Sequence, residues 1–284
     1  MSLLISCYFT IIITYRITQI KVRSRRAKIE VPVILSLNTL CILVVESALQ
    51  ILDVNWPTIQ RDFYEFIREE NSFFCQFRSY LYYSAVSALY WSCALQAFFR
   101  FVRIVHPECV RMHQAKIYYN IFIPGQILFA FGSVLPYLLI FKGIQLIPNE
   151  NYCTALISEF NSLLYLIFIL FALPLLVMFL CYICIIFKIR RTSTSKLYYR
   201  KRSRREYFII QRIMTVMLIL SVASLPSIVD LIIYAPHGRL DSRIYRIEWI
   251  SASLNALFLG LCQPFVNPQL RKLLKSRKTV RSKI

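Results

Sequence analysis

Charged residues are scarce in this sequence, and acidic residues are the scarcest of them. Only 17% of the 284 residues are charged, and Asp and Glu together number 14 against 34 for Lys and Arg. A soluble domain usually carries about a quarter charged residues, so the composition excludes an ordinary soluble globular protein. Apolar runs of roughly 20 residues recur along the whole chain instead, which is typical of membrane-spanning helices.

The residue patterns of phosphate binding, metal binding and covalent catalysis are also missing. Glycine occurs only five times and forms no phosphate-binding loop, and the HExxH motif is absent. The three histidines, His106, His113 and His237, do not have the spacing of metal ligands. The sequence therefore predicts no metal site, no cofactor and no enzymatic activity. The net charge of +20 is spread over short loops, which argues against nucleic acid as a partner.

The apolar runs predict an all-α membrane protein with seven spanning helices over residues 1–266. These helices are expected at about 3–17, 31–52, 75–101, 117–141, 160–187, 207–234 and 247–266. The first run is short, because crossing a bilayer takes about 20 residues. Either this helix is clipped or the sequence lacks its start, and a cleavable signal peptide is the competing interpretation of residues 1–17.

The basic residues predict the orientation of the chain. Of the 34 lysines and arginines, 26 fall in one alternating set of loops and 6 in the other. The first set comprises residues 16–30, 100–116, 188–206 and 267–284, and the second comprises 53–74, 142–159 and 235–246. Short loops rich in Lys and Arg stay in the cytoplasm and attract anionic membrane lipids. We therefore expect an extracellular N-terminus and a cytoplasmic C-terminus.

The stretch AFFRFVRIVHP ends the third apolar run and carries a recognisable pattern. Arg100 is followed by Pro107 seven residues later, which resembles the Asp-Arg-Tyr…Pro signature of the rhodopsin-like family of G-protein-coupled receptors. Phe99, Arg100 and Phe101 take the three signature positions. The resemblance implies that these residues lie at the cytoplasmic end of the third helix and take part in activation and G-protein coupling.

Two cysteines fit the same resemblance. Cys75 precedes Arg100 by 25 residues, or roughly 37 Å of helix, which places Cys75 at the extracellular face. Members of the family bridge a cysteine at this place to one in the second extracellular loop, where this chain has Cys153. The resemblance therefore implies a disulfide between Cys75 and Cys153. The remaining seven cysteines fall within spans or on the cytoplasmic side, where disulfides are not expected.

The fifth and sixth helices carry further markers of the family. Pro174 precedes Tyr182 by eight residues, and Glu206 precedes Pro226 by 20. The resemblance implies that the prolines kink their helices and that Tyr182 helps to stabilise the active state. It also implies that Glu206 pairs with Arg100 in the resting state. The simpler interpretation of each proline is a kink that the membrane helix tolerates.

The last helix and the tail complete the resemblance. Asn255 lies in SLNALFLG, and PFVNPQLRK resembles the start of an amphipathic eighth helix, expected within residues 267–284 on the inner leaflet. Several family markers are replaced, so the chain is a divergent member. Phe99 stands in place of the signature acid, and Asn38 in place of the second-helix acid. Ser224 replaces the sixth-helix Trp, and Leu259, Gly260 and Gln263 replace the seventh-helix Asn-Pro…Tyr.

Asn38 affects an expectation about ions, since it stands where relatives carry a carboxylate in the second helix. A buried carboxylate would hold a sodium ion by its charge, whereas Asn38 offers only an amide dipole. We therefore expect no tight sodium dependence of the inactive state.

The outer halves of the helices supply the candidate ligand-binding residues. These are Tyr82, Tyr83, Val86, Ser227, Leu231, Tyr245, Trp249 and Ser253. Relatives that bind biogenic amines have an Asp where this chain has Tyr82, and opsins have a Lys where it has Ser253, so the resemblance excludes amines and retinal. An aromatic-rich lining suits a peptide or a small apolar molecule. Tyr245 and Trp249 are equally explained as part of an interfacial aromatic belt.

The leading hypothesis is a plasma-membrane receptor that couples an extracellular ligand to a heterotrimeric G protein. Its mechanism would be outward movement of the sixth helix about Pro226, and its other partners would be membrane lipids. One alternative is a seven-helix binding protein that has lost signalling, which the replaced markers permit. A transporter is less favoured, because no repeat is present and only Glu46 and Asp230 fall near mid-span or outer-span positions.

Overall fold

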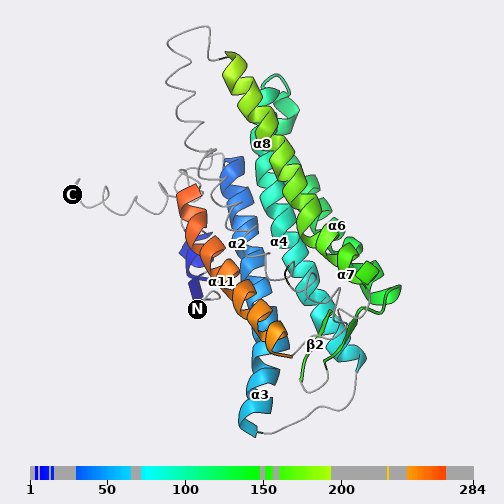
Figure 1. Cartoon of the computed structure of the whole chain (residues 1–284). Coiled ribbons are helices and arrows are strands. Elements are labelled where there is room, and N and C mark those ends of the chain that lie inside the picture. Colours follow the sequence, from blue (N-terminus) through cyan, green and yellow to red (C-terminus); the bar gives the residue numbers. More distant parts are fainter. Residues whose placement is uncertain are drawn as a thin grey trace, which may run out of the picture.

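The computed structural model describes residues 4–5, 7–12, 14–15, 30–64, 72–147, 151–155, 160–192, 229 and 242–266. Long helices lie side by side in this part of the chain (Figure 1). Among the described residues, four helices are long and apolar enough to cross a membrane: Val31–Tyr64, Phe73–Val105, Ala115–Leu139 and Asn161–Arg191. The protein is therefore a helical, multi-pass membrane protein.

The second predicted helix is longer than its sequence indicates. It consists of α2 (Val31–Gln50), the π-helical turn η1 (Ile51–Asn55) and α3 (Trp56–Tyr64), so the described helix extends beyond the predicted end at residue 52 as far as Tyr64. The polar residue Asp53 looks like the start of a loop. The structure instead buries Asp53 against the neighbouring helix, so this polar position continues the helix rather than ending it.

The central element of the bundle is α4 (Phe73–Val105), which packs against α2, α6 and α8. The Ser72 hydroxyl caps its N-terminus by accepting a hydrogen bond from the Cys75 backbone N–H at 3.3 Å. The helix ends just before Pro107, as expected from the restriction that a proline places on its preceding residue. It extends the predicted range of 75–101 at both ends.

The fourth and fifth predicted helices each contain a π-helical turn. The fourth runs through α5 (Ala115–Ile117), η3 (Tyr118–Phe122) and α6 (Ile123–Leu139), against a prediction of 117–141. The fifth runs through α7 (Phe160–Ile167), η4 (Phe168–Ala172) and α8 (Leu173–Thr192), against 160–187. Pro174 is the second residue of α8 and lies two positions after the end of η4, where a wider turn accommodates a residue that lacks a backbone N–H.

Two short strands connect α6 to α7, and the sequence analysis did not predict them. Strand β1 (Ile144–Leu146) pairs antiparallel with β2 (Cys153–Ala155), with Gln145 opposite Thr154. Strands of three residues are too short to produce a periodic sequence pattern. The hairpin lies at the end of the bundle where α3 also lies, at the bottom of Figure 1; we call this the disulfide end and the opposite one the Arg100 end.

The last described helix, α11 (Ser242–Val266), packs against α2 and begins earlier than the predicted range of 247–266. The Gln50 side chain joins the two helices, because its Nε2 donates to the Trp249 carbonyl at 3.2 Å and to Ser253 Oγ at 2.8 Å. The predicted eighth helix lies outside the described residues, as does the predicted sixth helix apart from Val229. The first apolar run is helical where it is described.

The buried side chains form two main clusters along α4. One cluster surrounds the disulfide end and includes Tyr82, Tyr152 and Trp249. The other lies towards the Arg100 end and includes Leu43, Ala97 and Tyr182. The helix α4 contributes to both clusters, so it connects the two ends of the bundle.

Candidate functional site

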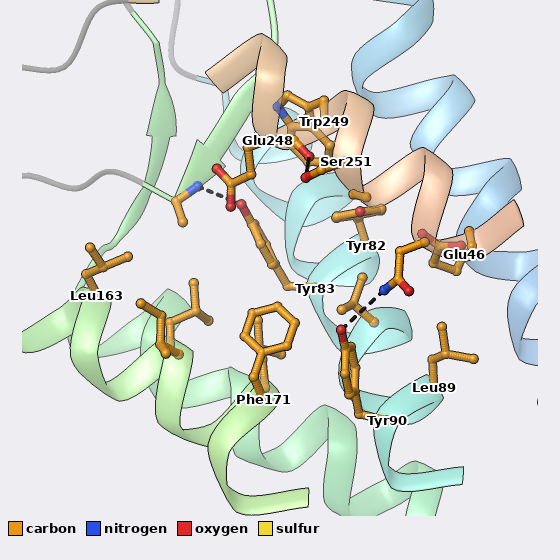
Figure 2. Close-up of a pocket in the computed structure, with 18 residues that line it drawn as sticks. Glu46, Tyr82, Tyr83, Leu89, Tyr90, Leu163, Phe171, Glu248, Trp249 and Ser251 are labelled. Carbon is orange, nitrogen blue, oxygen red and sulfur yellow. Dashed lines mark hydrogen bonds between the residues drawn. The ribbon is translucent and has the colours of Figure 1, made fainter. Parts of the chain in front are cut away.

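A cavity opens between α2, α4, α7, η4 and α11 near the disulfide end (Figure 2). About 940 Å³ of space lies between its walls and at its open mouth. Its lining combines mostly apolar and aromatic side chains with a few polar groups, which is the usual lining of a small-molecule site.

One wall of the cavity comes from a single face of α4. Tyr82, Tyr83, Val86 and Tyr90 all line it, because helical neighbours three, four and seven positions apart share a face. The Tyr83 hydroxyl contacts Thr154 Oγ1 at 2.6 Å and accepts a hydrogen bond from the backbone N–H of the next strand residue at 3.2 Å. This tyrosine is therefore held in place by β2.

The opposite wall is apolar and comes from α7 and η4. Leu163, Leu166, Leu170 and Phe171 line it. The Phe171 ring meets the Tyr90 ring nearly at a right angle, with centroids 4.9 Å apart, which is a favourable aromatic arrangement. The two walls therefore meet in an aromatic contact.

The helix α11 and one residue of α2 complete the cavity with polar groups. Glu248, Trp249 and Asn255 line it from α11, and Glu46 lines it from α2. The Trp249 ring packs on the Tyr82 ring at 4.9 Å, and Asn255 Nδ2 donates to the Tyr90 hydroxyl at 3.3 Å. These contacts join α11 to α4 across the cavity.

A buried polar cluster fastens the β-hairpin to the helices beside the cavity. The expected disulfide between Cys75 and Cys153 is present, with the two Cα atoms 5.7 Å apart. Ser79 Oγ lies 2.7 Å from Asp53 Oδ2 and 2.6 Å from the Cys153 carbonyl oxygen, and Arg78 Nε lies 3.5 Å from Asp53 Oδ1. The cluster therefore links η1, α4 and β2 at one point.

The structure brings together part of the predicted ligand-binding set. Tyr82, Tyr83, Val86 and Trp249 line the cavity. Ser253 does not belong to the lining, because its hydroxyl donates to the Trp249 carbonyl at 3.0 Å and accepts from Gln50, so it joins α11 to α2. Two other predicted positions, Ser227 and Leu231, lie outside the described residues. The Tyr245 side chain is not among the side chains that the structure describes.

The sequence analysis missed several lining residues for different reasons. Glu46 was noticed only as an acid near mid-span, although a buried carboxyl group is itself a signal of a site. Tyr90 lies seven residues after Tyr83, so helical spacing could have found it. Leu163, Leu166 and the other apolar residues of the fifth helix carry no such signal, because nearly every position of that run after Ser162 is similarly apolar.

The Arg100 end shows how the altered signature is accommodated. The Phe99 ring is buried and stands perpendicular to the Tyr118 ring of η3 at 5.2 Å. The Arg100 side chain lies within hydrogen-bonding reach of the buried Tyr182 hydroxyl of α8. Phe101 packs at the edge of the core. The hydrophobic residue that replaces the acid thus packs between the third and fourth helices.

The predicted core asparagines differ in where they point. Asn38 Nδ2 lies 3.5 Å from Gln126 Oε1, so the Asn38 amide faces α6, whereas Asn255 lines the cavity. Glu206 and Pro226 lie outside the described residues. Pairing of Arg100 with Glu206 therefore stays a prediction, as does the sodium independence expected from Asn38.

The bundle of apolar helices, the disulfide-anchored hairpin and the adjacent cavity define the class of protein: a multi-pass helical membrane protein with a cavity near one end of its bundle. The family described as 7 transmembrane receptor (rhodopsin family) matches residues 58–270, which is most of the chain. The chain belongs to this family, whose members are receptors rather than enzymes and generally respond to extracellular ligands through G proteins. A comparison with curated proteins found no match.

Proposed function

We propose that this protein binds an extracellular ligand in the cavity beside the disulfide and transmits the signal to a heterotrimeric G protein. The observation that carries this proposal is the arrangement along α4. Its outer half lines the cavity with Tyr82, Tyr83 and Tyr90, and its other end holds Arg100 beside Tyr182. One helix therefore connects this cavity with the residues that the family uses for coupling.

The topology is part of the same proposal. Seven helices would span the plasma membrane over residues 1–266, with residues 207–234 as the sixth helix and an amphipathic eighth helix within 267–284. The distribution of Lys and Arg supports an extracellular N-terminus. In that orientation the cavity and the hairpin face the outside, and the Arg100 end faces the cytoplasm.

The ligand would be a peptide or a small apolar molecule, and neither a biogenic amine nor retinal. Tyr82 stands where amine receptors carry their third-helix acid, and its ring packs on Trp249. Ser253 stands where opsins carry the retinal-linking lysine. The Tyr82 and Ser253 side chains are both engaged in packing or bonding between helices, which supports the exclusion.

The mechanism would be outward movement of the sixth helix about Pro226, which opens a cytoplasmic cavity around Arg100 and Tyr182. The ligand must then bind the open form more tightly than the closed form, because only differential affinity shifts a conformational equilibrium. The short reach between the Arg100 side chain and the Tyr182 hydroxyl supports a role for this pair in the open form.

A second candidate is a membrane binding protein that no longer signals. The burial of Phe99 against Tyr118 favours it, since relatives place an acid at the Phe99 position. A ligand-library screen in cells that carry promiscuous G-protein reporters separates the two. An agonist whose response disappears in Arg100→Ala supports the receptor. A ligand that binds at the surface of these cells without any reporter response supports the second candidate.

A further inference from the structure

Two carboxyl side chains line the cavity from different helices. Glu46 comes from α2 and Glu248 from α11. Figure 2 shows them on either side of the Tyr82 and Tyr83 pair. No Lys, Arg or His belongs to the lining among the residues that the structure describes. The described wall of the cavity is therefore acidic, in a chain that carries 34 basic and only 14 acidic residues.

Glu46 is the more deeply placed of the two acids, with 3% of its surface exposed. Its hydrogen-bond partner in the described part of the chain is the hydroxyl of its neighbour Ser47, which donates to Oε2 over a long 3.4 Å. A buried carboxylate is costly unless a cation or strong donors compensate it. Since Glu46 faces the cavity, a positively charged ligand group could supply that compensation.

Other groups around the cavity suit the same kind of ligand. Asn255 Oδ1 is a buried acceptor with no hydrogen-bond partner in the described structure. The rings of Tyr82, Tyr90 and Trp249 supply aromatic faces, which attract cations. The wall formed by Leu163 and its neighbours is apolar and suits a hydrophobic body next to the charge.

We infer that the ligand of this cavity carries one basic group on an apolar or aromatic body, which narrows the peptide or small apolar molecule proposed above: the basic group pairs with Glu46, and the body packs on α7 and η4. Glu248, which is half-buried, lines the cavity on the other side of the tyrosine pair. The inference rests on the proposed function, because it takes the cavity as the ligand site. The cation would be held by α2 and α11 rather than by the third helix.

The test uses two pairs of probes that differ only in charge, with the full-length protein in lipid nanodiscs. The peptide pair is acetyl-Phe-Arg-amide and acetyl-Phe-citrulline-amide, and the small-molecule pair is 3-phenylpropylamine and 3-phenylpropan-1-ol. Affinities are measured by titrating the shift of the unfolding temperature. We expect the charged member of at least one pair to bind about tenfold or more tightly than its neutral partner, because ion-paired hydrogen bonds are the strong ones. The pair that shows the preference identifies the source of the charge.

Three variants localise the effect. Glu46→Gln keeps the shape of the side chain and should remove most of the preference for the charged probe, and Glu248→Gln should reduce it. The matched control Glu108→Gln changes an exposed acid in the loop after α4 and should leave the preference intact. If Glu46→Gln does not fold, the comparison of charged and neutral probes on the unmodified protein still tests whether the cavity prefers a positively charged ligand.

Three results would overturn the inference. Equal affinity for charged and neutral probes on the unmodified protein would show an apolar pocket, which leaves the proposed receptor function standing. Persistence of the preference in the double variant Glu46→Gln/Glu248→Gln would assign the charge recognition to other residues. Binding by neither member of either pair also contradicts the inference, whereas the receptor function is decided separately by the reporter screen.

Discussion

At the scale of single residues, Arg100 has an unusual set of neighbours. The acid that normally precedes it in the family is Phe99, whose ring is buried against Tyr118. The Tyr182 hydroxyl of α8 lies within hydrogen-bonding reach of the Arg100 side chain. A hydroxyl carries no charge, so this contact orients the guanidinium by a hydrogen bond and not by an ion pair.

The Tyr182 hydroxyl should therefore matter for signalling and not for ligand binding. Tyr182→Phe removes only this oxygen, and a hydrogen bond to a charged group contributes about 1.5–3 kcal/mol. We expect agonist potency in a nucleotide-exchange assay to fall by about tenfold, with ligand affinity nearly unchanged. Tyr119→Phe is the control, because Tyr119 is exposed on the outside of the helices. Equal potency of both variants would show that the contact has no functional role.

Asp53 is the other residue whose environment departs from its sequence pattern. It is 1% exposed and meets Ser79 at 2.7 Å and Arg78 at 3.5 Å. Asp53→Asn keeps the shape and removes the charge, so the remaining bonds weaken in a buried site. We expect unfolding to be easier by about 1–3 kcal/mol, measured as a lower unfolding temperature in nanodiscs.

Asp62→Asn is the matched control for that measurement. The Asp62 carboxylate accepts two hydrogen bonds from the Arg246 guanidinium, at 3.1 and 3.2 Å, but both side chains are 39% exposed. An exposed ion pair contributes roughly 0–1 kcal/mol, so this variant should be close to the unmodified protein. If Asp62→Asn destabilised the protein more than Asp53→Asn, burial of the carboxyl group would not explain the difference in stability between the two variants.

At the scale of elements, the β-hairpin between α6 and α7 depends on its attachment to α4. The disulfide joins Cys75 to Cys153 over 78 positions of sequence. Closing a long loop lowers the entropy of the unfolded chain, and loss of a native disulfide typically costs about 2–5 kcal/mol. We expect Cys75→Ser/Cys153→Ser to lower the unfolding temperature and the surface expression.

The same double variant should also weaken ligand binding, because Tyr83 in the cavity is held by the strand that carries Cys153. Cys109→Ser is the control, since Cys109 is a free, exposed cysteine outside the bundle core. Unchanged stability and binding in the double variant would mean that the hydrogen bonds of Ser79 hold the hairpin without the disulfide.

Element boundaries show where sequence patterns are insufficient. The helix from Val31 was expected to end near residue 52, because Asp53 breaks the apolar run. The structure continues it to Tyr64, since Asp53 finds polar partners on α4. The π-helical turns η1, η3 and η4 have no sequence pattern of their own, because they add one residue to a turn without changing composition.

At the scale of the whole molecule, the unequal loop charges predict that the loop after α4 lies in the cytoplasm. Cys109 in that loop is exposed. A membrane-impermeant maleimide should therefore label it only after cells are permeabilised, and the Cys109→Ser variant should lose that part of the signal. Labelling of Cys109 on intact cells would reverse the orientation proposed from the Lys and Arg distribution.

The sequence determined the class of this protein by itself. Hydropathy, loop charge and the spacing of Arg100, Cys75 and Cys153 depend only on the order of residues along the chain. These properties predicted a rhodopsin-like receptor with one disulfide. The tertiary structure alone decided which residues meet. Glu46 and Glu248 are about 200 positions apart, and only the packing of α2 against α11 beside α4 places both carboxyl groups on one cavity. The same packing joins the Ser253 hydroxyl to the Gln50 side chain, so Ser253 does not belong to the described lining of the cavity.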